Sequence, residues 1–522
     1  MDDRKAVAGS IPATTDPQGP SRAAKEKVTG APPRLAKNTL LNMAGAAAPM
    51  AAAVVAIPIL VSGLGAVRFG VLAMAWGIVG YFGVLDLGLG RAVTQMVAER
   101  IGTEREPEIP TLVWTALLLT LAFGWAGAAL LVAPAGYLVR ELLDMPPELH
   151  REAAWAVVLL GLSLPLVTSM AGLRGVLEAT HQFGALNAIR LPMGLWAYLG
   201  PVLILPFSRS LIPVVAALLV GRFIGWVAHL AVCLYTVPFF SKRITIDRKA
   251  VRPLLLFGGW MTISNLASSV MIYFDRFLIG AVVSVAAVTY YVTPYEVAWR
   301  LTMIPSSLLF VLFPIFAATA LRDRSEAAEL FDRGARIVYL IMFPITLLLV
   351  VFAGDLLGLW LGPEFARNST VVLRWLALGS FFLSVGMTAA TALQGAGLPK
   401  ATGLVNLVEI PIYVVGLYWL VSQYGIVGAA IAWAVRAGVD AVALCWLVRR
   451  YHLGRRESFF RLGILMAAAL PMLFLGTTPQ TLGGRFAFAA CALIAFSVAG
   501  WRVILAPEER TGVRASLAAA GD

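Results

Sequence analysis

Fourteen apolar runs dominate the pattern of the chain, and short polar segments separate them. Most runs are close to the about 20 residues that a helix needs to cross a hydrocarbon core about 30 Å thick. The pattern therefore predicts an all-α membrane protein of about 14 transmembrane helices. The approximate cores of the runs are 40–60, 71–89, 112–132, 153–173, 186–205, 211–237, 254–282, 288–317, 337–352, 371–393, 404–421, 426–447, 462–475 and 486–505.

A loose internal repeat predicts that the runs form two halves. The connections after the fourth and the tenth run are both short, and both lead into a helix through an asparagine, Asn187 and Asn406. A repeated six-helix unit would place a substrate site between the halves, although chance also explains so short a match. The expected division is a disordered cytoplasmic tail (1–37), an N-terminal six-helix lobe (38–240), a cytoplasmic linker (241–252), a C-terminal six-helix lobe (253–448), a cytoplasmic loop (449–461), helices 13 and 14 (462–506) and a cytoplasmic tail (507–522).

Composition and charge support this class. Of the 522 residues, 59% are hydrophobic and only 13% are charged, far below the about 25% of soluble domains. With the N-terminus inside, 30 of the 41 Lys and Arg residues fall on the cytoplasmic side, 6 on the outer side and 5 deep in the runs. This split predicts a bacterial inner-membrane protein with both termini cytoplasmic. The net charge of +12 is thereby explained by topology, and no nucleic-acid partner is expected.

The sequence lacks the motifs that are typical of disulfide-bonded proteins, metalloproteins and ATPases. The three cysteines lie inside apolar runs, where they are expected to be small hydrophobic residues. The four histidines are scattered without ligand spacing, so we expect no metal site and no cofactor. The phosphate-binding loop of ATPases is also absent.

Charged residues inside the apolar runs are the candidate functional positions. A charge at mid-bilayer costs at least about 2.5–3.5 kcal/mol on insertion scales, so each one needs a partner or a polar cavity. These residues are Asp86, Arg91, Arg222, Asp275, Arg276, Glu296, Arg300, Arg374, Glu409, Arg436 and Asp440.

Spacing limits how these charges pair. Glu296 and Arg300 are four residues apart and share a helix face, so they either pair with each other or line a cavity together. Asp275 and Arg276 are adjacent, about 100° apart around a helix, and are expected to meet different partners. Arg276 and Arg300 can therefore either pair with nearby carboxylates for structural reasons or line a central cavity, and the sequence does not decide between these roles.

Structural roles are expected for the remaining charged residues, except for Arg222. Arg436 and Asp440 are four apart, and mutual neutralisation with Arg374 and Glu409 within one lobe is expected. Arg222 has no partner nearby in the sequence and is a better candidate for a cavity. Asp86 and Arg91 end the second run, where a structural cap or a gate is expected.

Two stretches of the chain resemble a known family. The first comprises GAVRFGVL at 65–72 and VLDLGLGRA at 84–92; the second comprises FDRFLIG at 274–280, YYVTPY at 290–295 and IPSSLLFVLFP at 304–314. These resemble the polysaccharide-transporter branch, including O-antigen flippases, of the multidrug/oligosaccharidyl-lipid/polysaccharide exporter superfamily. The resemblance covers nearly the whole chain. It implies two six-helix lobes in a V with two extra C-terminal helices, and outward flipping of polyprenyl-pyrophosphate-linked glycans by alternating access.

This inferred cargo suggests roles for individual residues. Arginine presents a fork of donors that matches phosphate oxygens, which favours Arg276, Arg300 and Arg222. Asn265, Tyr291 and Asn42 are candidates for glycan hydroxyls, although small polar residues also simply pack helices together. The expected coupling groups are Asp275 or Glu296. The expected gating positions are Asp86, Arg91, Pro294 and Pro305, the prolines because they remove helix hydrogen bonds.

Two other classes remain as alternatives. A cation-coupled multidrug antiporter of the related superfamily branch would need acidic and apolar cavity walls. A membrane enzyme, such as a glycan polymerase or ligase, would need a catalytic group on an outer loop, and the outer loops here are short. The expected partners of a flippase are a lipid-linked glycan, membrane lipids and glycan polymerase or ligase machinery.

Overall fold

The computed structural model describes residues 33–84, 89–101, 103–143, 145–180, 182–236, 246–247, 251–252, 254 and 273–504. Within these ranges the regular elements are all helical, as the apolar pattern predicts. Helices are expected in lipid because they satisfy their own backbone hydrogen bonds. The elements before residue 237 are α2 (Pro33–Val84), α3 (Leu89–Ala98), η1 (Glu106–Glu108), α4 (Ile109–Val132), α5 (Ala135–Tyr137), η2 (Leu138–Leu142), η3 (Pro147–Leu149), α6 (His150–Ala179), α7 (Phe183–Ile204) and α8 (Leu211–Thr236).

The second part of the chain begins with a helical stretch at 273–282. The elements that follow are α10 (Val285–Leu301), α11 (Met303–Arg322), α12 (Arg324–Val351), α13 (Ala353–Leu361), α14 (Pro363–Gly395), α15 (Pro399–Arg450), α16 (Arg456–Leu475), α17 (Leu482–Ala499) and η4 (Gly500–Ile504). Three of these helices begin with a side-chain cap, in which Ser284, Asp323 or Thr481 accepts a hydrogen bond from a backbone N–H two or three residues later.

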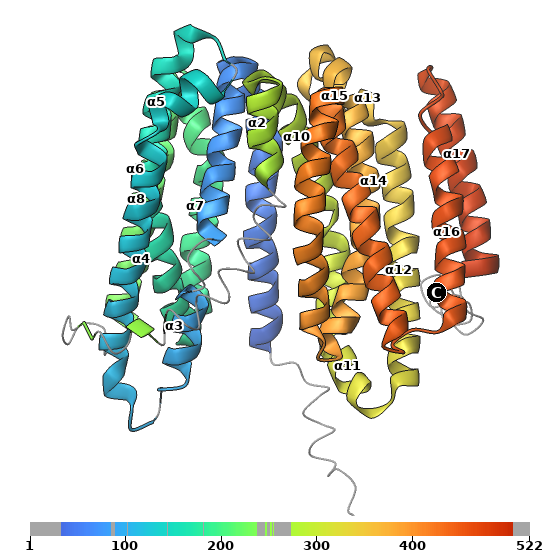
Figure 1. The fold of residues 1–522 in the computed structure, drawn as a ribbon, viewed down its shortest axis with the longest axis horizontal. Coiled ribbons are helices and arrows are strands. Elements are labelled where there is room, and N and C mark those ends of the chain that lie inside the picture. Colours follow the sequence, from blue (N-terminus) through green and yellow to red (C-terminus); the bar gives the residue numbers. More distant parts are fainter. Residues whose placement is uncertain are drawn as a thin grey trace, which may run out of the picture.

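The helices form two groups that stand side by side (Figure 1). The helices α3 to α8 make up one group, and α11 to α15 make up the other. The helices α2 and α10 lie where the groups meet, and α16 and α17 stand at the far edge of the second group. The boundaries of the two six-helix lobes remain a prediction, because 237–245 and 255–272 lie outside the described residues, as do most of both expected tails.

Eight of the described helices are long and apolar enough to cross a membrane, and the 462–475 run forms a shorter apolar helix within α16. Two long elements each contain two apolar runs. In α2 the backbone breaks at Gly65 (φ 78°), and in α15 it breaks at Gly425 (φ 58°). Glycine adopts these left-handed angles without the steric penalty of a Cβ atom. Because the run 254–282 is described only in part, the count of fourteen remains a prediction.

The run 288–317 was expected to be one helix, and it is interrupted. The helix α10 ends at Leu301, and α11 begins at Met303 after a turn at Thr302. Pro305 explains the interruption, because it has no N–H to donate to the carbonyl of Leu301 one turn earlier. Pro294 lies inside α10, which continues past it.

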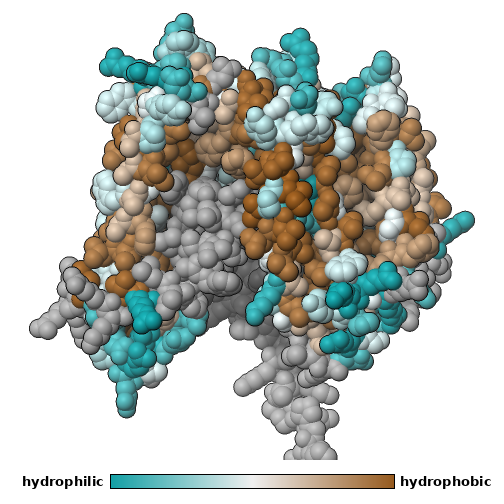
Figure 2. Space-filling view, in the orientation of Figure 1, coloured by the Kyte–Doolittle hydropathy of each residue, from teal (hydrophilic) through white to brown (hydrophobic). Residues whose placement is uncertain are grey.

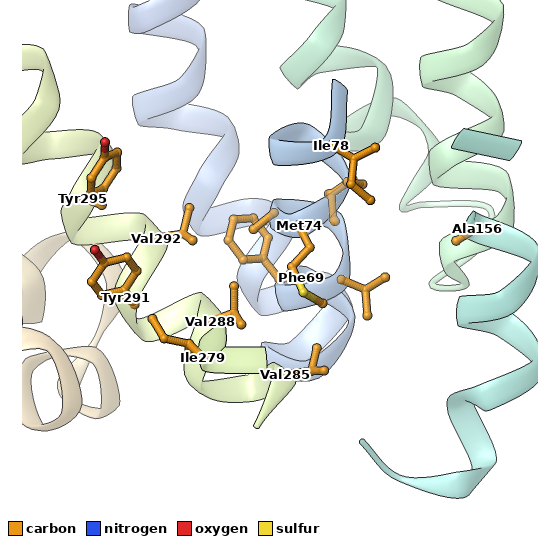
Figure 3. Close-up of a cluster of buried hydrophobic side chains, with 14 of the residues drawn as sticks. Phe69, Met74, Ile78, Ala156, Ile279, Val285, Val288, Tyr291, Val292 and Tyr295 are labelled. Carbon is orange, nitrogen blue, oxygen red and sulfur yellow. The ribbon is translucent and has the colours of Figure 1, made fainter. Parts of the chain in front are cut away.

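The two groups of helices are joined tightly at one end of the molecule, where Gly65 and the start of α10 lie. A Cβ atom at Gly70 of α2 would lie 2.1 Å from the carbonyl oxygen of Val285, so only glycine permits this approach. The Thr289 hydroxyl donates to the carbonyl of Ala66 (2.6 Å), and the indole of Trp360 in α13 donates to the carbonyl of Val54 (2.7 Å). Figure 3 shows the apolar side chains of α2 and α10 meeting in this region.

The opposite end carries the arginine-rich loops and is called the basic end below. It contains the turn between α3 and α4, with Arg100 and Arg105, and the turn between α15 and α16, with Arg455 (Figure 1). Figure 2 shows the surface hollowed between the two groups of helices toward this end. Among the described residues, the close contacts between the halves therefore lie at the end opposite the basic end.

Candidate functional site

Two arginines converge on one carboxylate in the middle of the molecule. The Arg276 guanidinium lies 3.2 Å from Glu296 Oε1, and the Arg300 guanidinium lies 3.5 Å from Glu296 Oε2. We call Arg276, Glu296 and Arg300 the central cluster. Glu296 is eleven residues into α10, so its Cα lies about 17 Å along the helix from its start. The cluster is therefore deep within the apolar part of the protein.

The pairing follows only in part from helix geometry. Arg300 and Glu296 lie on one face of α10, as their spacing predicts. Arg276 comes from the helical stretch 273–282 and reaches Glu296 from a neighbouring helix. Its neighbour Asp275 points to a different residue of α10 and accepts a hydrogen bond from the Tyr291 hydroxyl (2.5 Å). The adjacent charges thus meet different partners.

Aromatic rings frame the central cluster and connect it to the first group of helices. The guanidinium of Arg276 lies 5.3 Å from the ring centres of Tyr273 and of Tyr295, within the range of a cation–π contact. The Arg300 guanidinium is 3.5 Å from the hydroxyl of Tyr198 in α7, at the limit of a hydrogen bond. The Tyr198 ring packs on Trp76 of α2, 5.3 Å between centres. The cluster therefore lies between the two groups of helices.

The exposure of the three charged side chains shows which of them a ligand can reach. Arg276 retains only 4% of its side-chain exposure, whereas Arg300 retains 21% and Glu296 retains 30%. The buried Arg276 Nε has no acceptor among the described residues. Since an arginine carries five N–H donors, the pair retains donors for an added anion.

A second buried group of charges occupies α15. Arg436 lies 3.9 Å from Glu409, and its guanidinium is 5.5 Å from the centre of the Tyr413 ring. Mutual neutralisation was expected among Arg436, Asp440, Arg374 and Glu409, and the carboxylate within 4 Å of Arg436 is that of Glu409, on the preceding arm of the hairpin. Asp440 Oδ1 has no hydrogen-bond partner within the described ranges.

Two further intramembrane arginines, Arg374 and Arg222, have neutral hydrogen-bond partners. Arg374, which was expected to share in neutralisation with Glu409, donates instead to the carbonyl of Val350 (3.2 Å). Arg222 donates to the Ser163 hydroxyl of α6 (3.1 Å). Arg222 lines a separate cavity among α6, α7 and α8, and none of the described lining residues of that cavity belongs to the central cluster.

Several predicted site residues are not tested by this geometry. Asp86 and Asn265 lie outside the described residues, as do the side chains of Asn42 and Arg91. Tyr291 is fully buried, and its hydroxyl is occupied by Asp275. Pro294 and Pro305 are buried in α10 and α11. Across the described residues, no group of three or more His, Cys, Asp or Glu side chains is arranged to hold a metal ion.

The aromatic and hydroxyl partners of these charges were not predicted from the sequence. Tyr198, Tyr273 and Trp76 lie in apolar runs, where an aromatic residue looks like ordinary core. Ser163 lies 59 residues before Arg222 and gives no local sign of the contact. The only available signal was the presence of tyrosine and tryptophan in spans that also carry arginine.

This arrangement defines the class of the protein. Helical halves that meet at one end, with paired charges between them, are the architecture of an alternating-access membrane transporter. A lipid II flippase in an inward closed conformation has a similar fold, with a TM-score of 0.68 at 12% identity, covering 89% of this chain and 99% of that chain. An inward-facing multidrug transporter of the same superfamily gives 0.64 at 16% identity, covering 81% of this chain and 99% of the other.

The sequence comparisons identify the family. Residues 64–370, more than half of the chain, match the family described as "Polysaccharide biosynthesis protein". A Shigella flexneri protein named "Putative O-antigen transporter" is 31% identical over 417 residues, which is 79% of this chain and 97% of that protein. The chain belongs to this polysaccharide biosynthesis family of multi-pass membrane transporters, which confirms the resemblance seen in its motifs.

Proposed function

We propose that this protein is a flippase that moves polyprenyl-diphosphate-linked oligosaccharide or polysaccharide precursors across a bacterial inner membrane. The Shigella flexneri relative is named for O-antigen transport, and the structural neighbour with a TM-score of 0.68 is named as a lipid II flippase. Both names refer to glycan export, and neither refers to enzymatic catalysis. The family assignment supports the same class of cargo.

The observation that carries the proposal is the convergence of Arg276 and Arg300 on Glu296 between the two groups of helices. A diphosphate is anionic and presents several oxygens, which suit the planar donor fork of arginine. A cationic drug would need a free carboxylate at this place, whereas Glu296 is engaged by two guanidinium groups. The geometry therefore favours the flippase over the multidrug antiporter.

Glu296 holds the arginines while no cargo is bound. An arriving diphosphate competes with the Glu296 carboxylate for the same N–H donors, and repulsion between like charges at close range favours displacement of the carboxylate. This exchange is our proposal for coupling cargo binding to a titratable group. Asp275, held by Tyr291, is the second candidate for this coupling role.

The transport path is proposed from the two ends of the molecule. The basic end is expected to face the cytoplasm, because Lys and Arg collect on that side of membranes. The close contacts between the helix groups lie at the opposite end, so we propose that cargo enters from the cytoplasm. Separation of α2 from α10 at the opposite end, with bending near Pro305, would then release cargo outward, where polymerase or ligase machinery is the expected partner.

Flipping of a fluorescent lipid-linked glycan in proteoliposomes tests the proposal. Arg276→Gln and Arg300→Gln are each expected to lower the initial rate at least tenfold, because a hydrogen bond to a charged group contributes about 1.5–3 kcal/mol. Arg374→Gln is the matched control, since this arginine also lies in a span but donates to the Val350 carbonyl. Wild-type rates in both cluster variants would remove the central cluster as the diphosphate site.

A further inference from the structure

A separate cavity with a basic lining lies within the first group of helices. It is a partly open cavity of about 480 Å³ among α6, α7 and α8, a size that is ordinary for small-molecule sites. Its charged lining residues are Arg174, Glu178, Arg190 and Arg222, and His229 also contributes. We call it the basic cavity. Neither the family nor the central cluster accounts for it.

The charges of the basic cavity do not balance. Glu178 pairs with Arg174 at 3.5 Å. Among the described residues no carboxylate lies within ion-pair distance of Arg190 or Arg222. Arg222 has only the neutral Ser163 hydroxyl as a hydrogen-bond partner in the described ranges. The cavity therefore carries excess positive charge.

Arg222 lies far from both ends of its helix. It is 11 residues from the start of α8 and 14 from its end, or about 17 and 21 Å along the axis. A guanidinium without an acidic partner at such a depth is costly, because lipid cannot solvate its charge. An anion in the cavity would offset this cost.

The walls between the arginines are apolar. Met170 and Met193 face the cavity with Leu218, and methionine adapts its shape to irregular partners. Trp196 presents its ring, while its indole N–H is already used by the carbonyl of Ala217 (2.8 Å). The cavity therefore suits a ligand that has an anionic group on an apolar chain.

A glycan does not fit this lining. The described lining residues include no Ser, Thr, Asn or Gln side chain. Sugar hydroxyls that leave water need hydrogen-bond partners, and burying each one without a partner costs free energy. The basic cavity is thus distinct in chemistry from a site for the sugar part of the cargo.

We propose that the basic cavity binds a lipid phosphate, with Arg222 as the inner anchor of the phosphate and the Met170 and Met193 walls against the chain. Two sources can supply this chemistry, namely an isoprenoid phosphate and an anionic phospholipid of the bilayer. Val167 of α6 through Glu178 spans about 16 Å, enough for a phosphate and part of a chain. The proposal does not depend on glycan transport, because it concerns a different set of residues.

Native mass spectrometry of the full chain in neutral detergent tests the proposal. The probes are geranylgeranyl phosphate, geranylgeraniol, inorganic phosphate and phosphatidylglycerol. Geranylgeranyl phosphate is expected to bind, and Arg222→Gln to weaken it about tenfold or more, as expected for a lost hydrogen bond to a charged group. Equal binding of phosphatidylglycerol would identify the bilayer as the source, and weaker binding would identify an isoprenoid phosphate.

Matched variants make the test decisive. Arg374→Gln is expected to leave binding unchanged, and Arg222→Lys is expected to restore part of it. Val167→Phe fills the cavity without removing a charge, and it serves as the test if Arg222→Gln fails to fold. Undiminished binding in both Arg222→Gln and Val167→Phe would overturn the proposal. The same holds if geranylgeraniol binds as well as its phosphate, if inorganic phosphate binds as well as the lipid, or if Arg276→Gln alone abolishes binding.

Discussion

Glu296 is the residue on which the charge balance between the two groups of helices depends. It accepts from Arg276 of a neighbouring helix and lies beside Arg300 of its own. The carboxylate is the most exposed of the three, so it is the member that a ligand from the hollow meets first. Arg276, buried below it, is fixed in place by Tyr273 and Tyr295.

The pair of Glu409 and Arg436 gives a prediction about stability. Both side chains are nearly buried, with 8% and 12% of their exposure left. Glu409→Leu leaves Arg436 without its carboxylate and is expected to destabilise the fold by about 3 kcal/mol, because an unpaired buried charge remains. Thermal melting in detergent measures the loss.

Two comparisons complete this experiment. Val408→Leu changes an exposed neighbour and is expected to melt like the wild type. The double variant Glu409→Leu with Arg436→Leu removes both charges and is expected to recover part of the lost stability. A double variant that melts no higher than Glu409→Leu would show that the pair is not the source of the effect.

Partners that come from other helices explain why the sequence predicts only part of the site. The spacing of Glu296 and Arg300 predicts their contact, because both residues lie on one helix. The pairing of Arg276 with Glu296 depends on how two helices are packed, and periodicity contains no such information. For the same reason the spacing of Arg436 and Asp440 does not reveal that the carboxylate nearest to Arg436 is that of Glu409, which comes from the preceding helical arm.

At the scale of whole elements, the break between α10 and α11 shows how a proline acts. Hydropathy alone merges these helices, because the apolar residues continue across Thr302. The missing N–H of Pro305 separates them, whereas Pro294 does not interrupt α10. Hydropathy therefore predicts the existence of the helices well and their continuity poorly.

Pro305→Ala tests whether this break has a role in transport. Alanine restores the N–H that donates to the Leu301 carbonyl, so α10 and α11 are expected to join into a straighter helix. Flipping rates in proteoliposomes are expected to fall several-fold, with melting unchanged or raised. Pro294→Ala is the control and is expected to have a smaller effect. Wild-type flipping rates in both variants would show that the break between α10 and α11 is not needed for transport.

At the scale of the whole molecule, closure at one end includes one close backbone approach beside the hydrogen bonds of Thr289 and Trp360. The backbone of α2 at Gly70 touches that of α10 at Val285, and the neighbouring Thr289 is fully buried. Any side chain at position 70 must push the two helices apart. The chain thus contains a place where its conformational balance can be changed without altering a charge.

Gly70→Val is expected to shift the molecule toward opening at this end. In a background without the three native cysteines, Thr289→Cys is expected to react several-fold faster with an impermeant maleimide when Gly70→Val is also present. Gly136→Val is the matched control, because a Cβ atom there meets nothing within 4 Å. Unchanged labelling would show that the contact does not hold the end closed.

The orientation of the molecule gives a further prediction. Thr103 lies in the turn between α3 and α4 at the basic end, and Thr478 lies between α16 and α17 at the other end; both are exposed. In intact cells, Thr478→Cys is expected to react with an impermeant maleimide and Thr103→Cys to react only after lysis. The opposite result would reverse the proposed direction of transport.

The shared carboxylate of the central cluster has a consequence for the half of the cycle in which the transporter carries nothing. After unloading, two bare guanidinium groups would have to be dehydrated again as the empty carrier resets. Glu296 is already in place as an internal counter-ion, so the cluster resets with one net positive charge instead of two, and less charge has to be dehydrated.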